Sequence, residues 1–182
     1  MSSRVAGEGR YARVEREQRW LLSHLPPGLG DPVSIVDLYI TGTRLRLRRL
    51  ETGTEVIYKL AQKVRPPSGT PETVQLTNIY LSDREYAVLA QLDGAELRKA
   101  RWSGLLGDRW LAVDELGGRL TGLILAEAEL SPDEERLAAP PFAVSDVTDD
   151  DRFSGGALAH ATVEEVEALL AYCASLAGGR SD

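Results

Sequence analysis

The sequence has little of several residue types on which common classes of protein depend. It contains one cysteine, Cys173, two histidines and only 6% aromatic residues in a chain of 182. A single cysteine excludes a disulfide-stabilised scaffold and fits a reducing compartment, so we predict a cytoplasmic protein. His24 and His160 lie far apart in the sequence and lack the spacing of metal ligands, so no histidine-based metal site is predicted.

Long apolar stretches and two common catalytic loops are also missing. The longest apolar run is far too short to cross a bilayer, and the charged start MSSRVAGEGRYARVERE lacks the apolar stretch of a secretory signal. We therefore expect no membrane partner. There is no phosphate-binding P-loop and no G-x-S-x-G nucleophile elbow, so side chains would have to hold any nucleotide or phosphate.

Charge is distributed unevenly along the chain. The net charge is −7, yet residues 103–182 hold sixteen acidic against five basic residues, while the preceding part is slightly basic. The negative total argues against nucleic acid as a partner. The length predicts a single domain over residues 1–182, in which the two oppositely charged parts come together.

Periodicity predicts strands first and helices later. Turn residues such as Thr41-Gly42, Thr52-Gly53 and Gly117-Gly118 separate the candidate strands and favour antiparallel hairpins. Capping motifs that start at Ser82, at Ser131 and at Thr162 predict three helices, the last over residues 162–177. The predicted strands are Arg13–Leu22, Ser34–Ile40, Thr43–Leu50, Thr54–Lys63, Thr73–Leu81, Leu97–Leu105, Arg109–Glu115 and Gly122–Leu130.

Charged side chains alternate along five of these strands and so share one face of each. An ordinary β-sandwich would expose such rows to water, and the alternation alone is compatible with that arrangement. The rows are sorted by sign and rich in arginine, which favours the other possibility, a closed sheet with a charged tunnel. The rows are Glu15, Glu17 and Arg19; Arg44, Arg46 and Arg48; Lys59 and Lys63; Lys99 and Arg101; and Glu127 and Glu129.

A tunnel of this kind cannot be empty and dry, because unpaired buried charge is costly. It must hold water, counter-ions or a ligand. Carboxylates suit a hard divalent ion such as Mg²⁺ or Mn²⁺, and rows of arginine and lysine suit a polyphosphate. The pattern therefore predicts a metal-bound phosphate compound as the ligand.

The order of these rows resembles the motifs of the CYTH domain, or triphosphate tunnel metalloenzyme, superfamily. Glu15-x-Glu17-x-Arg19 is similar to the family's ExExK motif, with arginine in place of the lysine. The resemblance covers about residues 13–160. Further matching segments are Arg44-Leu-Arg46-Leu-Arg48, Tyr58-Lys59-Leu-Ala-Gln-Lys63, Leu97-Arg-Lys99-Ala-Arg101-Trp, Trp110-Leu-Ala-Val-Asp114, Glu127-Ala-Glu129 and Asp146-Val-Thr148-Asp-Asp-Asp-Arg152-Phe.

The resemblance implies a fold of the α+β class, mainly antiparallel β, in which an eight-stranded closed barrel forms a charged tunnel with helices packed outside. It also implies a dependence on Mg²⁺ or Mn²⁺. The expected metal ligands are Glu15, Glu17, Asp114, Glu127 and Glu129, and the residues expected to act in catalysis are Glu17, Arg19 and Lys99. The expected substrate-binding residues are Arg44, Arg46, Arg48, Lys59, Lys63, Lys99, Arg101 and Arg152.

The activity that the resemblance implies is metal-dependent hydrolysis of a triphosphate, with inorganic triphosphate as the first choice of substrate. ATP and thiamine triphosphate are the other candidate substrates. Alternatives are adenylyl cyclisation of the class IV type, thiamine triphosphate hydrolysis, and a non-catalytic module that binds polyphosphate or nucleotides. The protein is expected to be a monomer or a homodimer.

Overall fold

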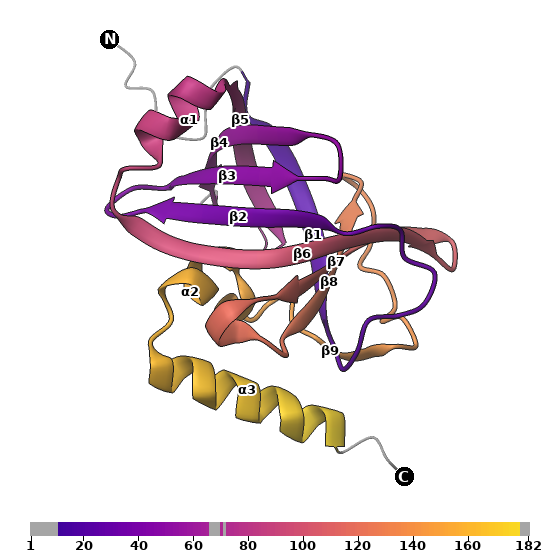
Figure 1. Cartoon of the computed structure of the whole chain (residues 1–182). Helices are drawn as coiled ribbons and strands as arrows, with labels where there is room; N and C mark the ends of the chain where they lie inside the picture. Colours follow the sequence, from indigo (N-terminus) through magenta and orange to yellow (C-terminus); the bar gives the residue numbers. More distant parts are fainter. Residues whose placement is uncertain (1–10, 66–69, 71, 179–182) are drawn as a thin grey trace.

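The computed structural model describes residues 11–65, 70 and 72–178, so the charged start over residues 1–10 lies outside the described part. All eight predicted strands are present, with ends that differ by a few residues, and a short ninth strand follows them (Figure 1). The strands are β1 (Arg13–Leu22), β2 (Val33–Ile40), β3 (Leu45–Glu51), β4 (Val56–Val64), β5 (Thr73–Leu81), β6 (Gly94–Leu106), β7 (Arg109–Leu116), β8 (Ile124–Leu130) and β9 (Ala143–Asp146).

The sheet closes on itself as an antiparallel barrel. Its order is β5-β4-β3-β2-β6-β7-β8-β1, and β1 also pairs with β5 to complete the ring. One edge of β1 pairs with β8, while the other edge is shared: Arg13 to Arg16 pair with β5, and Trp20 to Leu22 pair with β9. The predicted eight-stranded barrel is therefore confirmed, and β9 is an addition that pairs with β1 beyond Thr73, the first residue of β5.

The register of the strands places the charged rows on the inner face. Arg48 lies opposite Lys59 across β3 and β4, and Arg101 lies opposite Asp114 across β6 and β7. Arg19 in turn lies opposite Glu127 across β1 and β8. Directly opposed residues of neighbouring strands project to the same side of a sheet, so the rows meet inside the barrel. The sandwich with its charges in water is excluded.

Two of the predicted helices form where their capping motifs predict them. Helix α1 (Asp83–Leu89) begins after Ser82, whose side chain and that of Glu85 form a capping box. Helix α3 (Val163–Gly178) follows Thr162, whose hydroxyl accepts a hydrogen bond from the Glu165 amide. The short helix α2 (Gly155–His160) was not predicted; Ser154 caps its start.

The helix predicted at Ser131 is wrong. Nη1 of Arg16 donates hydrogen bonds to the carbonyl oxygens of Ser131, Pro132 and Glu134, at 2.7, 2.9 and 2.8 Å. Carbonyls that accept from a distant guanidinium are turned away from a helical ladder, so a tertiary contact outweighs the local capping sequence. The segment is an irregular connection between β8 and β9.

Apolar side chains fill two regions around the charged interior. At one end of the barrel, inward-facing Leu97, Leu116 and Leu125 join a buried cluster with residues of α2 and α3, which lie below the barrel in Figure 1. On the outside of β1, β7 and β8, a second cluster is covered by loop residues such as Leu29 and Phe142. Within the described residues, no helix combines the length and apolar character needed to cross a membrane.

Candidate functional site

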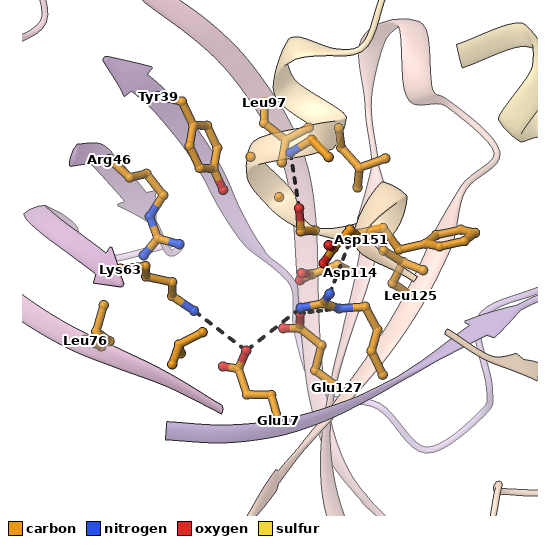
Figure 2. A pocket seen from close by; sticks show the side chains of 18 of the residues that line it. Glu17, Tyr39, Arg46, Lys63, Leu76, Leu97, Asp114, Leu125, Glu127 and Asp151 are labelled. Atoms are coloured by element: carbon orange, nitrogen blue, oxygen red, sulfur yellow. Dashed lines mark hydrogen bonds and ion pairs between the residues drawn. The ribbon is translucent and has the colours of Figure 1, made fainter. Parts of the chain in front are cut away.

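The interior of the barrel contains a cavity of about 690 Å³. Its walls carry eight cationic and six acidic side chains, so cations exceed acids by two. Figure 2 shows labelled side chains from several strands pointing toward one another around this space. The cationic residues are Arg19, Arg44, Arg46, Arg48, Lys63, Arg65, Lys99 and Arg101, and the acidic residues are Glu15, Glu17, Glu72, Asp114, Glu127 and Asp151.

Most of the residues singled out in the sequence line this cavity, and three do not. Lys59 faces the inside at its register position, but its ammonium lies over the Tyr80 ring at 4.9 Å. Glu129 lies opposite Glu17 in the register of β1 and β8 and is exposed. Arg152 is the clear exception. Its guanidinium pairs with Asp150 on the surface, so the structure does not bring it to the cavity.

Five of the lining residues form a tightly bonded group that we call the paired cluster: Arg19, Lys99, Arg101, Asp114 and Glu127. Asp114 accepts from the Lys99 ammonium at 2.5 Å and from two nitrogens of Arg101 at 2.6 Å each. Glu127 accepts from Arg101 at 2.7 Å and from Nε and Nη2 of Arg19 at 2.9 and 2.7 Å. Each acid is therefore held between cations from neighbouring strands.

The electrostatics of the paired cluster follow from this arrangement. Burial alone would raise the pKa of the Asp114 carboxyl, but Lys99 and Arg101 outweigh it and lower that pKa. Burial is likewise outweighed at Glu127, where Arg19 and Arg101 hold the pKa well below its ordinary value. The Lys99 ammonium shows the opposite balance, because burial lowers its pKa more than Asp114 raises it.

Asp37 is a buried acid that the sequence analysis did not assign to the site. Its side chain is 1% exposed and accepts from Nε and Nη2 of Arg48 at 2.6 Å each, while Nε of Arg46 lies 3.6 Å from Oδ1. Burial would raise the pKa of Asp37, and the hydrogen bonds and charge of Arg48 lower it. Asp37 is the only charged residue in strand Val33–Ile40, and this was the signal that could have revealed a partner of the arginine row.

The three glutamates Glu15, Glu17 and Glu129, which we call the glutamate row, have looser contacts. Glu15 and Glu17 are both 27% exposed, and their carboxylates lie 3.8 and 3.7 Å from the Lys63 ammonium. Burial raises the pKa of Glu15, and the negative charges of Glu17 and Glu129 raise it further against the effect of Lys63. Carboxylates that repel one another at a partly open site provide favourable surroundings for an added cation.

The glutamate row fits a divalent ion by the chemistry of its oxygens. Among the described residues, no three acidic, histidine or cysteine side chains are grouped closely enough to hold a metal on their own. Mg²⁺ is commonly bound by one or two carboxylates together with phosphate oxygens of a substrate, so a protein cage is not required. Asp114 and Glu127 fit this role less well, because lysine and arginine already occupy their oxygens.

Part of the cavity wall comes from a segment of which the sequence analysis assigned only Arg152 to the site. Residues 147–160, which we call the cap segment, contribute Thr148, Asp151 and the stretch from Phe153 to Leu158. Tyr39 of β2 also lines the cavity, and its ring meets that of His160 edge to face at 6.2 Å. A Cβ atom at Gly155 would overlap the Tyr39 hydroxyl, so glycine allows the cap segment to approach β2 closely.

Solved structures with a similar arrangement include two of the protein NE1496. The crystal structure of the inorganic triphosphatase NE1496 is 27% identical, covers 81% of this chain and 95% of that chain, and gives a TM-score of 0.57. A structure of NE1496 described as a hypothetical protein is 29% identical, with coverages of 80% and 97% and a TM-score of 0.56.

A third similar structure is that of the PH1819 protein from Pyrococcus horikoshii OT3. It is 15% identical, covers 89% of each chain and has a TM-score of 0.50, so it bears on the fold alone. No family model matches the sequence, and no curated protein matches it. The closed antiparallel barrel and its likeness to NE1496 identify the fold. The chain has the fold of the CYTH, or triphosphate tunnel metalloenzyme, superfamily.

Proposed function

We propose that this protein hydrolyses a triphosphate compound inside the barrel, with inorganic triphosphate as the preferred substrate and Mg²⁺ or Mn²⁺ as the cofactor. The observation that carries the proposal is the cavity itself, in which eight cationic side chains surround a space of about 690 Å³. Support comes from NE1496, an inorganic triphosphatase of similar structure. The single cysteine keeps a cytoplasmic location as our prediction.

The arginine and lysine side chains bind and orient the phosphate chain. Among the residues that the structure describes, Arg44, Arg46 and Lys63 have no tight carboxylate partner and remain available to phosphate oxygens, whereas Lys99 and Arg101 are shared with Asp114. Guanidinium groups bind phosphate through parallel hydrogen bonds, which fix the chain as well as attract it. Held in this way, the terminal phosphorus is presented to water in one orientation, and this lowers the entropic part of the barrier.

The metal would be held by Glu15, Glu17 and Glu129 together with oxygens of the substrate. It would supply positive charge to the phosphoryl oxygens as charge develops during hydrolysis. Three groups of residues would then act separately. The glutamate row would neutralise the charge of the metal, and Arg44, Arg46 and Lys63 would bind the substrate. The acids of the paired cluster would keep Lys99 and Arg101 directed at the substrate. The cap segment excludes bulk water from the apolar end.

A direct test incubates the purified protein with inorganic triphosphate, ATP or thiamine triphosphate and with Mg²⁺, Mn²⁺ or excess EDTA. We expect phosphate release from inorganic triphosphate to be fastest and to stop in EDTA. Pyrophosphate and a cyclic nucleotide from ATP would instead indicate a cyclase. Turnover that continues undiminished in EDTA would contradict the metal assignment.

A non-catalytic module that binds polyphosphate or nucleotides is the second candidate. Two observations favour this candidate. In the described part of the chain, no three acidic, histidine or cysteine side chains are grouped to hold a metal, and lysine and arginine already occupy the carboxylate oxygens of Asp114 and Glu127. Calorimetry with inorganic triphosphate distinguishes the two. Tight binding without product from any of the three substrates would favour the binding module.

A further inference from the structure

Four hydrogen bonds fasten the cap segment to β1 at one residue, Arg19, and in one of them the Thr148 hydroxyl donates to the Arg19 carbonyl at 3.3 Å. The Val147 amide donates to the Arg19 carbonyl at 2.9 Å, and the Arg19 amide donates to the Thr148 hydroxyl at 2.9 Å. Nη1 of the Arg19 side chain donates to the Phe153 carbonyl at 3.2 Å. Main chain and side chain of one residue therefore hold both the start and the middle of the cap segment.

The rest of the Arg19 guanidinium is directed at Glu127. Nε and Nη2 donate to Oε1 of Glu127 at 2.9 and 2.7 Å, so all three nitrogens have protein acceptors. The side chain is only 16% exposed. A guanidinium spreads its donors over a rigid fork, whereas the ammonium of a lysine is a single point, which cannot occupy both positions at once.

The cap segment forms the closed end of the cavity. Phe153 and Leu158 are 1% and 2% exposed, and they belong to the same buried cluster as Leu97, Leu116 and Leu125. Those three leucines also line the cavity, so its floor is apolar at this end. A displaced cap segment would admit water to this floor and to the Glu127 carboxylate.

We propose that Arg19 is a positioning residue, which fixes the cap segment and the Glu127 carboxylate relative to each other and thereby keeps one end of the cavity closed. The effect on turnover rests on the triphosphatase function proposed above, whereas the hold on the cap segment does not. Arginine at this position thus replaces the lysine of the related motif because it serves two elements at once. This differs from the expectation that Arg19 acts directly in catalysis.

Hydrogen exchange of the substrate-free protein tests the hold on the cap segment. In Arg19→Lys, the charge remains and the bond to the Phe153 carbonyl is lost, so exchange of the Phe153 and Leu158 amides should rise about tenfold. The matched control is Arg48→Lys. Arg48 is an equally buried arginine with a two-bond contact to Asp37 and no bond to the cap segment, so this variant should leave those amides unchanged.

A second variant loosens the cap segment from outside the cavity. Arg119 donates hydrogen bonds to the carbonyls of Leu158, Ala159 and Ala161 at the end of α2, and it does not line the cavity. In Arg119→Ala, exchange of the Leu158 amide should also rise. With inorganic triphosphate and Mg²⁺, both Arg19→Lys and Arg119→Ala should lower kcat about tenfold and change KM by less than about threefold, because the phosphate-binding cations are intact.

The outcomes separate the two proposals. Wild-type exchange of the Phe153 and Leu158 amides in Arg19→Lys would overturn the inference, as would an equal rise of exchange in β3 and β4. Faster exchange of the Leu158 amide in Arg119→Ala, together with an unchanged kcat, would overturn the link between the cap segment and turnover. If the wild-type protein hydrolyses no triphosphate, the proposed function fails, and the exchange experiment still decides what Arg19 holds.

Discussion

The same charged residue types sit in two different environments within one barrel. In the paired cluster, the acids lie 2.5 to 2.7 Å from their cations, and Asp114 is only 4% exposed. In the glutamate row, Glu15 and Glu17 are 27% exposed, and their nearest lysine is 3.7 to 3.8 Å away. The difference teaches that an inward-facing acid in a charged tunnel is not automatically a metal ligand. The paired acids stabilise and aim cations, while the glutamate row is left for a ligand.

Removal of one acid from each group should give the sharpest contrast in stability. Asp114→Ala leaves Lys99 and Arg101 buried without their partner and should lower the free energy of unfolding by about 3–5 kcal/mol. Glu15→Ala removes a partly exposed carboxylate and should change the free energy of unfolding by less than about 1 kcal/mol. Urea unfolding followed by circular dichroism measures both. Equal losses would contradict the division into two groups.

Turnover should depend on the glutamate row in a way that substrate binding does not. Glu129→Gln should lower kcat for inorganic triphosphate on the order of 100-fold, because a carboxylate expected to hold the metal is lost. Triphosphate binding without metal should be retained or become tighter, since one negative charge is gone. Steady-state kinetics and calorimetry measure these effects, and Glu164→Gln on the exposed face of α3 is the control. Wild-type turnover in Glu129→Gln would exclude this glutamate as a ligand.

Two arginines predicted to bind substrate should behave differently. Arg46 lines the cavity, and Arg46→Ala should weaken triphosphate binding about tenfold, because a charge-assisted contact is lost. Arg152 is 57% exposed and pairs with Asp150 outside the cavity, so Arg152→Ala should leave affinity unchanged. Binding isotherms at a fixed ionic strength compare them. A loss of affinity in Arg152→Ala alone would show that the surface arginine reaches the substrate.

The smallest expected effect is a shift in the pH dependence of binding. Burial lowers the pKa of Lys99, so this ammonium loses its charge at a lower pH than exposed lysines do. Triphosphate affinity should be constant below that pKa and should fall as pH rises through it. In Lys99→Arg the charge persists, so the fall should move to higher pH. Isotherms between pH 7 and 10 that are the same for both proteins would contradict the lowered pKa.

The barrel was predictable because alternation survives in nearly every strand. Rows such as Arg44, Arg46 and Arg48 keep a strict period of two, and a one-residue slip would turn all of them outward. Strand β9 carries no such signal. It has four residues and exists through its pairing with Trp20 to Leu22, far away in the sequence. Local patterns cannot reveal an element that only a distant partner stabilises.

The candidate site was predictable in its members and less so in their partners. The sequence placed Glu127 and Asp114 inside the barrel, but it could not show that arginine and lysine occupy their oxygens. The start of the cap segment matched a family motif, but helix α2 was not predicted because Gly155 and Gly156 disfavour a helix. The place of the cap segment against the cavity depends on contacts with Arg19 and Tyr39, which the sequence does not show. Arg152 matched a motif, yet its salt bridge with Asp150 directs it to the surface.

The position of β1 in the barrel determines when the site can form during folding. The neighbouring pairs from β2 to β5 and from β6 to β8 include hairpins between strands adjacent in sequence, which need only short loops to close. Among the described strands, β1 pairs with β8, β5 and β9 and not with its sequence neighbour β2. Arg13 lies opposite Leu76 and Glu17 lies opposite Glu129, so both pairings of β1 must close long loops, and we expect β1 to join the barrel late.

That late strand also carries Glu15, Glu17 and Arg19. Docking of β1 is therefore the event that both seals the ring and delivers the glutamates and the arginine to the interior. A chain that lacks only this docking would have its arginine rows in place but no means to neutralise a metal or fasten the cap segment. Completion of folding and acquisition of the proposed activity are then the same step.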